Sequence, residues 1–106
     1  MVVPETNNAL NSLVDTARRA SRAGRPDEAA RAWEQVRAAV PAHPEALFFF
    51  GRRALAQGDA NGAVQWLARA AQAAPKDALV PLSLANAYRA LGNTNLEMTA
   101  LDAALK

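Results

Sequence analysis

Apolar residues recur three and four positions apart over most of this chain, which is the spacing of one face of an α-helix. Short breaks that contain Gly or Pro divide the pattern into segments of about a dozen residues. The pattern predicts six helices, over about 10–23, 27–40, 44–57, 60–74, 79–91 and 94–105. We therefore expect an all-α protein with a single domain over residues 10–106, preceded by a flexible N-terminal tail over residues 1–9.

The breaks between the predicted helices repeat at a fixed interval. Gly24, Gly58 and Gly92 follow one another every 34 residues, and Pro41 and Pro75 are separated by the same number. A Gly can take the left-handed conformation that closes a helix, and a Pro stops the helix before it. Several positions sharing one interval indicate an internal repeat, in which each unit is a pair of helices.

Residues after each Gly suit the start of a second helix. Asp59 and Asn93 are candidate N-caps, because their side chains can accept hydrogen bonds from backbone N–H groups of the first turn. The first unit has Arg25 at this place, followed by Pro26, which is acceptable in a first helical turn.

This 34-residue unit resembles the tetratricopeptide repeat. The first helix of that repeat has a large residue, then Leu-Gly and then Tyr, and its second helix has Ala, a large residue and a terminal Pro. The middle unit carries Leu47, Phe50-Gly51, Ala54, Ala63, Leu67 and Pro75. The matching residues of the first unit are Leu13, Thr16-Ala17, Ala20, Ala29, Trp33 and Pro41, and those of the third are Pro81, Leu84-Ala85, Tyr88, Leu101 and Ala104. The resemblance implies a right-handed α-α superhelix of three helix-turn-helix repeats, over about 10–43, 44–77 and 78–106, the last incomplete.

The third unit departs from the other two. Glu97 stands where the first two units have a small Ala, and Pro81 replaces a large core residue. The last helix also leaves Met98, Leu101 and Leu105 without an evident partner. We expect this unit to be the loosest, and we expect the chain either to continue in a longer protein or to form a homodimer through its uncapped final helix.

Residues 48–50 are the only three Phe of the chain and are consecutive. Phe50 shares the core stripe of its helix, so Phe48 and Phe49 must point elsewhere, because neighbours on a helix diverge by about 100°. In tetratricopeptide arrays the first helices line a concave groove where ligands usually lie. The resemblance thus places Phe48 and Phe49 at that groove, although both could instead pack against the flanking helices near Val14 and Leu82.

Polar residues on or near the same face add charge to the predicted groove. The candidate peptide-binding residues are Arg18, Arg22, Phe48, Phe49, Arg52, Asn86 and Arg89. Arginine can hold a carboxylate in a bidentate fork, which suits a peptide with apolar anchors and acidic residues. The alternative is that these arginines are solvated or are paired with Asp15 and Glu45.

Some tetratricopeptide domains grip the C-termini of chaperones with Lys and Asn side chains of the first helices. The corresponding places here carry Val14, Arg18, Phe49, Leu79 and Ser83, of which only Arg18 offers a comparable charge. We therefore expect no chaperone-tail binding of that type.

Composition argues against other functions. The chain has no Cys, and its one histidine, His43, lies in a turn between two prolines, so we expect no metal site, no cofactor and no catalysis. The net charge is only +2, which argues against nucleic-acid binding. No apolar run suits a signal peptide or a membrane span, and we expect a cytoplasmic protein.

Two functions remain. The first is a non-catalytic protein-interaction module that binds a peptide or partner protein in the groove. The alternative is the N-terminal scaffold of a larger bacterial enzyme, since the stretches "ALFFFGRRALAQGD" and "EMTALDAALK" resemble the helical arrays in front of aspartyl/asparaginyl hydroxylase-like catalytic domains.

Overall fold

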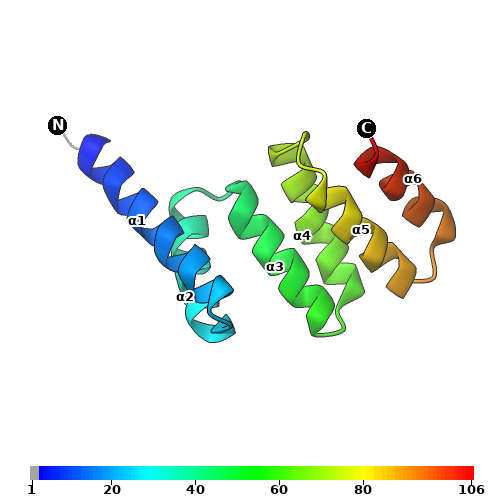
Figure 1. Cartoon of the computed structure of the whole chain (residues 1–106), viewed down its shortest axis with the longest axis horizontal. Helices are drawn as coiled ribbons and strands as arrows, with labels where there is room; N and C mark the ends of the chain where they lie inside the picture. Colours follow the sequence, from blue (N-terminus) through cyan, green and yellow to red (C-terminus); the bar gives the residue numbers. More distant parts are fainter. Residues whose placement is uncertain (1–2) are drawn as a thin grey trace.

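The computed structural model describes residues 3–106, and side chains from residue 8 onward. This part of the chain forms six α-helices and no strand: α1 (Val3–Arg22), α2 (Pro26–Ala39), α3 (Pro44–Ala56), α4 (Ala60–Ala73), α5 (Leu79–Ala90) and α6 (Thr94–Ala104). The helices pair as three hairpins that stack side by side into an elongated array measuring 50 × 27 × 19 Å (Figure 1). The predicted all-α superhelix of three helical hairpins is confirmed.

The N-terminus is the one place where a predicted helix boundary is wrong by more than one or two residues. α1 begins at Val3, whereas the apolar pattern predicted a start at residue 10. Polar side chains in this first part of α1 gave no apolar face from which its helical conformation could be recognised. Residues 3–9 are therefore helical, and residues 1–2 of the predicted tail lie outside the described residues.

The turn within each hairpin has the predicted conformation. Gly24, Gly58 and Gly92 have φ angles of 71°, 84° and 74°, in the left-handed region that a residue with a Cβ rarely adopts. Asp59 caps α4, since its side chain accepts a hydrogen bond from the Gly62 N–H at 2.9 Å. Asn93 caps α6 in the same way, with the Leu96 N–H at 3.1 Å, so both predicted N-caps are confirmed.

Small residues allow the two helices of a hairpin to approach closely. Ala17, Gly51 and Ala85 hold equivalent positions in the first helices, and all three are buried. A Cβ atom added to Gly51 would lie 2.6 Å from Cγ and Cδ2 of Leu67, which is closer than carbon atoms can approach. The middle hairpin therefore packs α3 against α4 with no room for even one additional carbon at this contact.

Large residues fill the space beside these contacts. Trp33 and Leu67, which hold the same place in the first and second repeats, are almost completely buried. The equivalent Leu101 in the third repeat is only half-buried, and Ala100 is the one buried residue of α6. Met98 and Leu105 expose 63% and 86% of their surface, so the apolar exposure expected for the last helix is confirmed.

Candidate functional site

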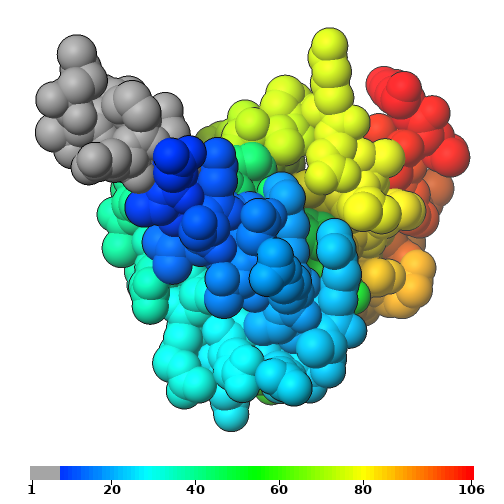
Figure 2. Space-filling view, turned by 60° about the vertical axis from the view of Figure 1, so that its left-hand side comes forward, coloured from blue at the N-terminus to red at the C-terminus, as the bar shows by residue number. Residues whose placement is uncertain are grey.

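Two adjoining hollows lie along the first helices of the hairpins, α1, α3 and α5. The first, of about 560 Å³, lies between α1, the start of α2 and α3; the second, of about 430 Å³, lies between α3 and α5. Phe48, Arg52 and Ala56 of α3 line both hollows, so the two meet over this helix. In Figure 2, α1 (blue) and the start of α5 (yellow) flank the green surface of α3. We refer to the two hollows together as the concave groove.

The three phenylalanines divide between the core and the groove less sharply than the helical pattern predicted. Phe50 packs against Trp66, with ring centroids 5.3 Å apart, and meets Phe49 edge-on at 5.2 Å. Phe49 also lies 6.2 Å from Trp33, in the core between the first two repeats. Phe48 packs toward the third repeat. All three side chains are half-buried, and Phe48 and Phe49 both line the groove.

Arg18 is engaged by an acidic neighbour. Its guanidinium forms a bidentate pair with Glu45 at the start of α3, in which Nε donates to Oε2 at 2.8 Å and Nη2 donates to Oε1. Asp15 lies 3.9 Å away on the same helix. Hydrogen bonding to Glu45 raises the pKa of Arg18, and the same bond lowers the pKa of the Glu45 carboxyl. The alternative that Arg18 is paired with Asp15 and Glu45 is therefore confirmed.

Arg22 and Arg52 differ from Arg18. Among the side chains that the structure describes, neither has a carboxylate oxygen within 4.0 Å. The Arg52 guanidinium lies over the ring of Phe48, 5.6 Å from its centroid, so cation and aromatic ring form one surface at the centre of the groove. Two further arginines of the first hollow, Arg25 and Arg53, have only long ion pairs, at 3.6 and 3.9 Å.

The remaining predicted groove residues lie on α5. Asn86 lines the second hollow beside Ser83. Arg89 lines neither hollow; its Nε donates to Oε2 of Glu97 on α6 at 2.8 Å. The structure thus brings together six of the seven predicted residues at the groove and places Arg89 outside it.

The groove also has lining residues that were not among the seven candidates. Leu79 and Leu82 of α5 expose 59% and 43% of their surface at the second hollow. Glu45 was considered only as a partner for arginine, yet it lines the first hollow itself. The repeat period could have placed these residues, because Leu79 is 34 residues after Glu45 and occupies the same position of the next unit.

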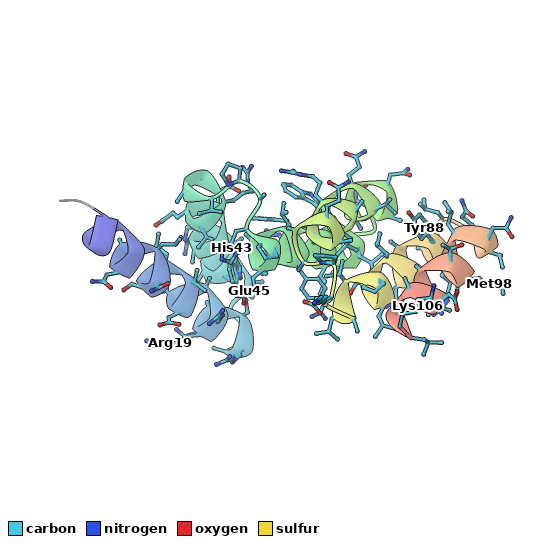
Figure 3. The ribbon with its side chains drawn as sticks, turned by 90° about the horizontal axis from the view of Figure 1, so that it is seen from above. Arg19, His43, Glu45, Tyr88, Met98 and Lys106 are labelled. Atoms are coloured by element: carbon cyan, nitrogen blue, oxygen red, sulfur yellow. The ribbon has the colours of Figure 1, made fainter. Side chains whose placement is uncertain are left out.

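His43 is the N-terminal neighbour of α3, as its place in the turn predicted. Its carbonyl accepts the first hydrogen bond of the helix, from the Leu47 N–H at 3.0 Å. The ring lies 6.1 Å from Trp33, and its Nδ1 is buried with no hydrogen-bond partner. Burial is the main cause that lowers the pKa of His43. Figure 3 shows His43 and Glu45 together at the junction between α2 and α3.

Two kinds of feature were not found in the described part of the chain. No three His, Asp or Glu side chains there could hold a metal ion together. None of its helices is both long enough and apolar enough to cross a membrane.

The fold and the groove define a helical-repeat protein, and comparison with known proteins gives the family. The model of the tetratricopeptide repeat matches residues 14–78, so the chain belongs to the tetratricopeptide repeat family. As a class, such repeats are protein-interaction modules, and they are typically non-catalytic scaffolds. No curated protein matches the sequence.

A solved structure matches almost the whole array. A mutant of Thermobaculum terrenum O-GlcNAc transferase superposes with a TM-score of 0.84 at 28% sequence identity. The match covers 93% of this chain and 19% of the transferase chain. The chain is therefore similar to about a fifth of that protein.

Proposed function

We propose that this chain is a non-catalytic module that binds a peptide segment of a partner protein in the concave groove. One observation carries the proposal: Phe48 and Arg52, stacked on each other, are shared by both hollows, and Arg52 has no carboxylate within 4.0 Å among the described side chains. Aromatic residues and arginine are both enriched at protein interfaces, and arginine is enriched at their energetic hot spots.

The two hollows differ in chemistry, which indicates the kind of peptide. Arg22, Arg25 and Arg53 surround the first hollow, whereas Leu79 and Leu82 line the second. We therefore expect a bound segment to place acidic side chains over α1 and an apolar side chain between α3 and α5. α3 lies between the two subsites, a helix with its side chains is about 10 Å wide, and an extended chain advances about 3.3 Å per residue. The two groups should therefore be separated by at least about three residues.

Selection from a displayed library of random twelve-residue peptides tests this proposal. Binders should be enriched on the wild-type chain, and their affinity should fall at least tenfold for the Phe48→Ala/Arg52→Ala double variant while its helical circular dichroism remains. Arg31→Ala is the matched control, because Arg31 is exposed on α2 and lines neither hollow. Equal binding by the double variant would contradict the assignment of the groove.

A scaffold beside a catalytic domain is the second candidate function. It is favoured by the match to part of a transferase chain, since that protein has the same helical arrangement within an enzyme. The hydroxylase-like catalytic domain considered from the sequence has no further support. The coding sequence after Lys106 provides the test: a catalytic domain in the same frame would support this candidate, and an immediate stop codon would remove it.

A further inference from the structure

A third hollow lies away from the concave groove, between the end of α4, α5 and α6. It has a volume of about 250 Å³ and shares no lining residue with either hollow of the groove. Its lining residues are Ala71, Ala74, Pro75, Asp77, Pro81, Leu84, Tyr88, Leu96, Thr99, Ala100 and Ala103. Figure 1 shows the three helices at the C-terminal end of the array, in green, yellow and red.

The preceding repeat shows what occupies the equivalent space. Residue 100 corresponds to residue 66 in the 34-residue period, so Ala100 stands where the second repeat has Trp66. The Trp66 ring lies 5.3 Å from the Phe50 ring, and Leu84 replaces Phe50 in the third repeat. An indole side chain therefore fills this position between the first two repeats, whereas a methyl group and an open hollow are found between the last two.

The charged neighbours of the tryptophan are also missing. The Arg37 and Arg69 guanidinium groups lie 5.7 and 5.4 Å from the centroid of the Trp66 ring. Their counterparts one period later are Ala71 and Ala103, which both line the hollow. Three large side chains are thus replaced by three alanines around one space, and the larger Tyr88, in place of Ala54, does not close it.

The size and charge of the hollow restrict its ligand. A volume of about 250 Å³ is below the range of about 300–1,000 Å³ for drug-sized ligands, but it exceeds the roughly 150 Å³ of an apolar cavity that holds benzene. Asp77 is the only charged residue among the described residues that line the hollow, and its Oδ1 already accepts a hydrogen bond from the Leu79 N–H at 3.0 Å. Apart from Asp77, Tyr88 and Thr99, the lining is apolar, and such a lining is complementary to a neutral ring.

We propose that this hollow is a second binding site, which receives a tryptophan side chain of a partner protein in the place that Trp66 occupies one repeat earlier. The partner's indole would pack on Leu84 and Ala100 as the Trp66 ring packs on Phe50. The site is independent of the concave groove, and either can exist without the other.

Titration of the ¹⁵N-labelled chain with N-acetyl-tryptophanamide tests the site. We expect saturable shifts of the amide resonances of Ala71, Leu84 and Ala100, with a dissociation constant on the order of 1 mM, and no such shifts with N-acetyl-alaninamide. The pentapeptide Gly-Gly-Trp-Gly-Gly should bind at the same residues. Absence of saturable shifts there would overturn the proposal, and so would binding of free indole without binding of the pentapeptide.

Ala100→Trp provides the decisive variant, because it supplies the missing side chain from the chain itself. It should weaken N-acetyl-tryptophanamide binding at least tenfold and raise the melting temperature by roughly 4 °C or more. Met98→Trp is the matched control, since Met98 is on the same helix but outside the hollow, at the outer end of the array (Figure 3). Undiminished binding by Ala100→Trp would show that the ligand lies elsewhere. If that variant does not fold, Ala100→Leu should still weaken binding severalfold.

Discussion

The second and third repeats have the same backbone arrangement but different core side chains. In the second repeat, Leu67 is completely buried and Trp66 packs on Phe50. At the same places the third repeat has the half-buried Leu101 and the small Ala100. The turns hardly differ, since Gly58 and Gly92 have similar φ angles and both are followed by an N-cap with a hydrogen bond. The local residues of the turn and the N-cap thus preserve the hairpin, while the volume of the side chains in its core varies.

Glu97 shows how the third repeat accommodates a departure from the pattern. It stands where the second repeat has the fully buried Ala63, yet its side chain remains 17% exposed and accepts a hydrogen bond from Arg89. Arg89 in turn stands where the second repeat has Leu55. A Leu–Ala pair in one repeat is therefore replaced by an Arg–Glu pair in the next, which explains why Arg89 faces α6 and not the groove.

The largest expected effect comes from moving this glutamate into the second repeat. Ala63→Glu would bury a carboxylate beside Leu55 with no arginine to pair it, and an uncompensated buried charge costs about 3–5 kcal/mol. Chemical denaturation of the variant should show this loss in the free energy of unfolding. Adding Leu55→Arg should restore part of it. A loss below about 1 kcal/mol for the single variant would show that α4 can carry a charge at this position without the ion pair.

A smaller effect is expected at the close contact between α3 and α4. Ala17 and Ala85 are tolerated at this place in the first and third repeats, but a Cβ on Gly51 would meet the fully buried Leu67. Gly51→Leu should overpack the middle hairpin and lower the free energy of unfolding by about 1–3 kcal/mol. The free energy of unfolding of Gly51→Ala should lie between those of Gly51→Leu and the wild type. An unchanged melting temperature for Gly51→Leu would mean that the helices separate at little cost.

The smallest effect concerns pH and distinguishes the two junctions between repeats. The first junction has His43 and Glu45, where the second has Asp77 and Leu79. Burial lowers the pKa of His43 below 6.5, and hydrogen bonding to Arg18 lowers the pKa of Glu45 below 4.5. As the pH falls, His43 and Glu45 are therefore protonated in the unfolded chain before they are protonated in the folded chain. The stability that each group contributes above its ordinary pKa is then lost as the pH falls below that pKa.

Melting curves between pH 8 and pH 3 measure this dependence. The melting temperature should begin to fall as the pH drops below about 6.5, and it should fall further below about 4.5 through Glu45. His43→Asn should remove the first decrease, because Asn can cap α3 but does not titrate in this range. An identical pH profile for His43→Asn and the wild type would exclude His43 as its source.

Residue patterns in the sequence were sufficient to predict the helices and the family. The interval between Gly24, Gly58 and Gly92 located every hairpin turn, and helix starts at Pro26, Pro44, Ala60, Leu79 and Thr94 lie within one residue of the predicted positions. These features depend on local backbone preferences, which a sequence displays directly. The start of α1 was missed because its first turns have no apolar stripe to mark them.

The groove was predicted only in part, because side-chain partners depend on distances between helices. The face of each first helix could be assigned from the period, and six of the seven candidate residues lie at the groove. The sequence could not show that Arg18 is held by Glu45 from the next repeat or that Arg89 reaches Glu97. Both pairs join different helices, so the spacing of residues within one helix does not reveal them.

The amino-acid sequence by itself determined the number of hairpins, their turns and the small residues at which helices touch, because these follow from preferences within a few residues and repeat along the chain. Only the tertiary structure decided which arginines are already paired, that Phe48 and Arg52 join two hollows, and that Ala100 leaves a space where Trp66 fills one. Those features arise where side chains of different helices meet, and these side chains come into contact only once the repeats have stacked.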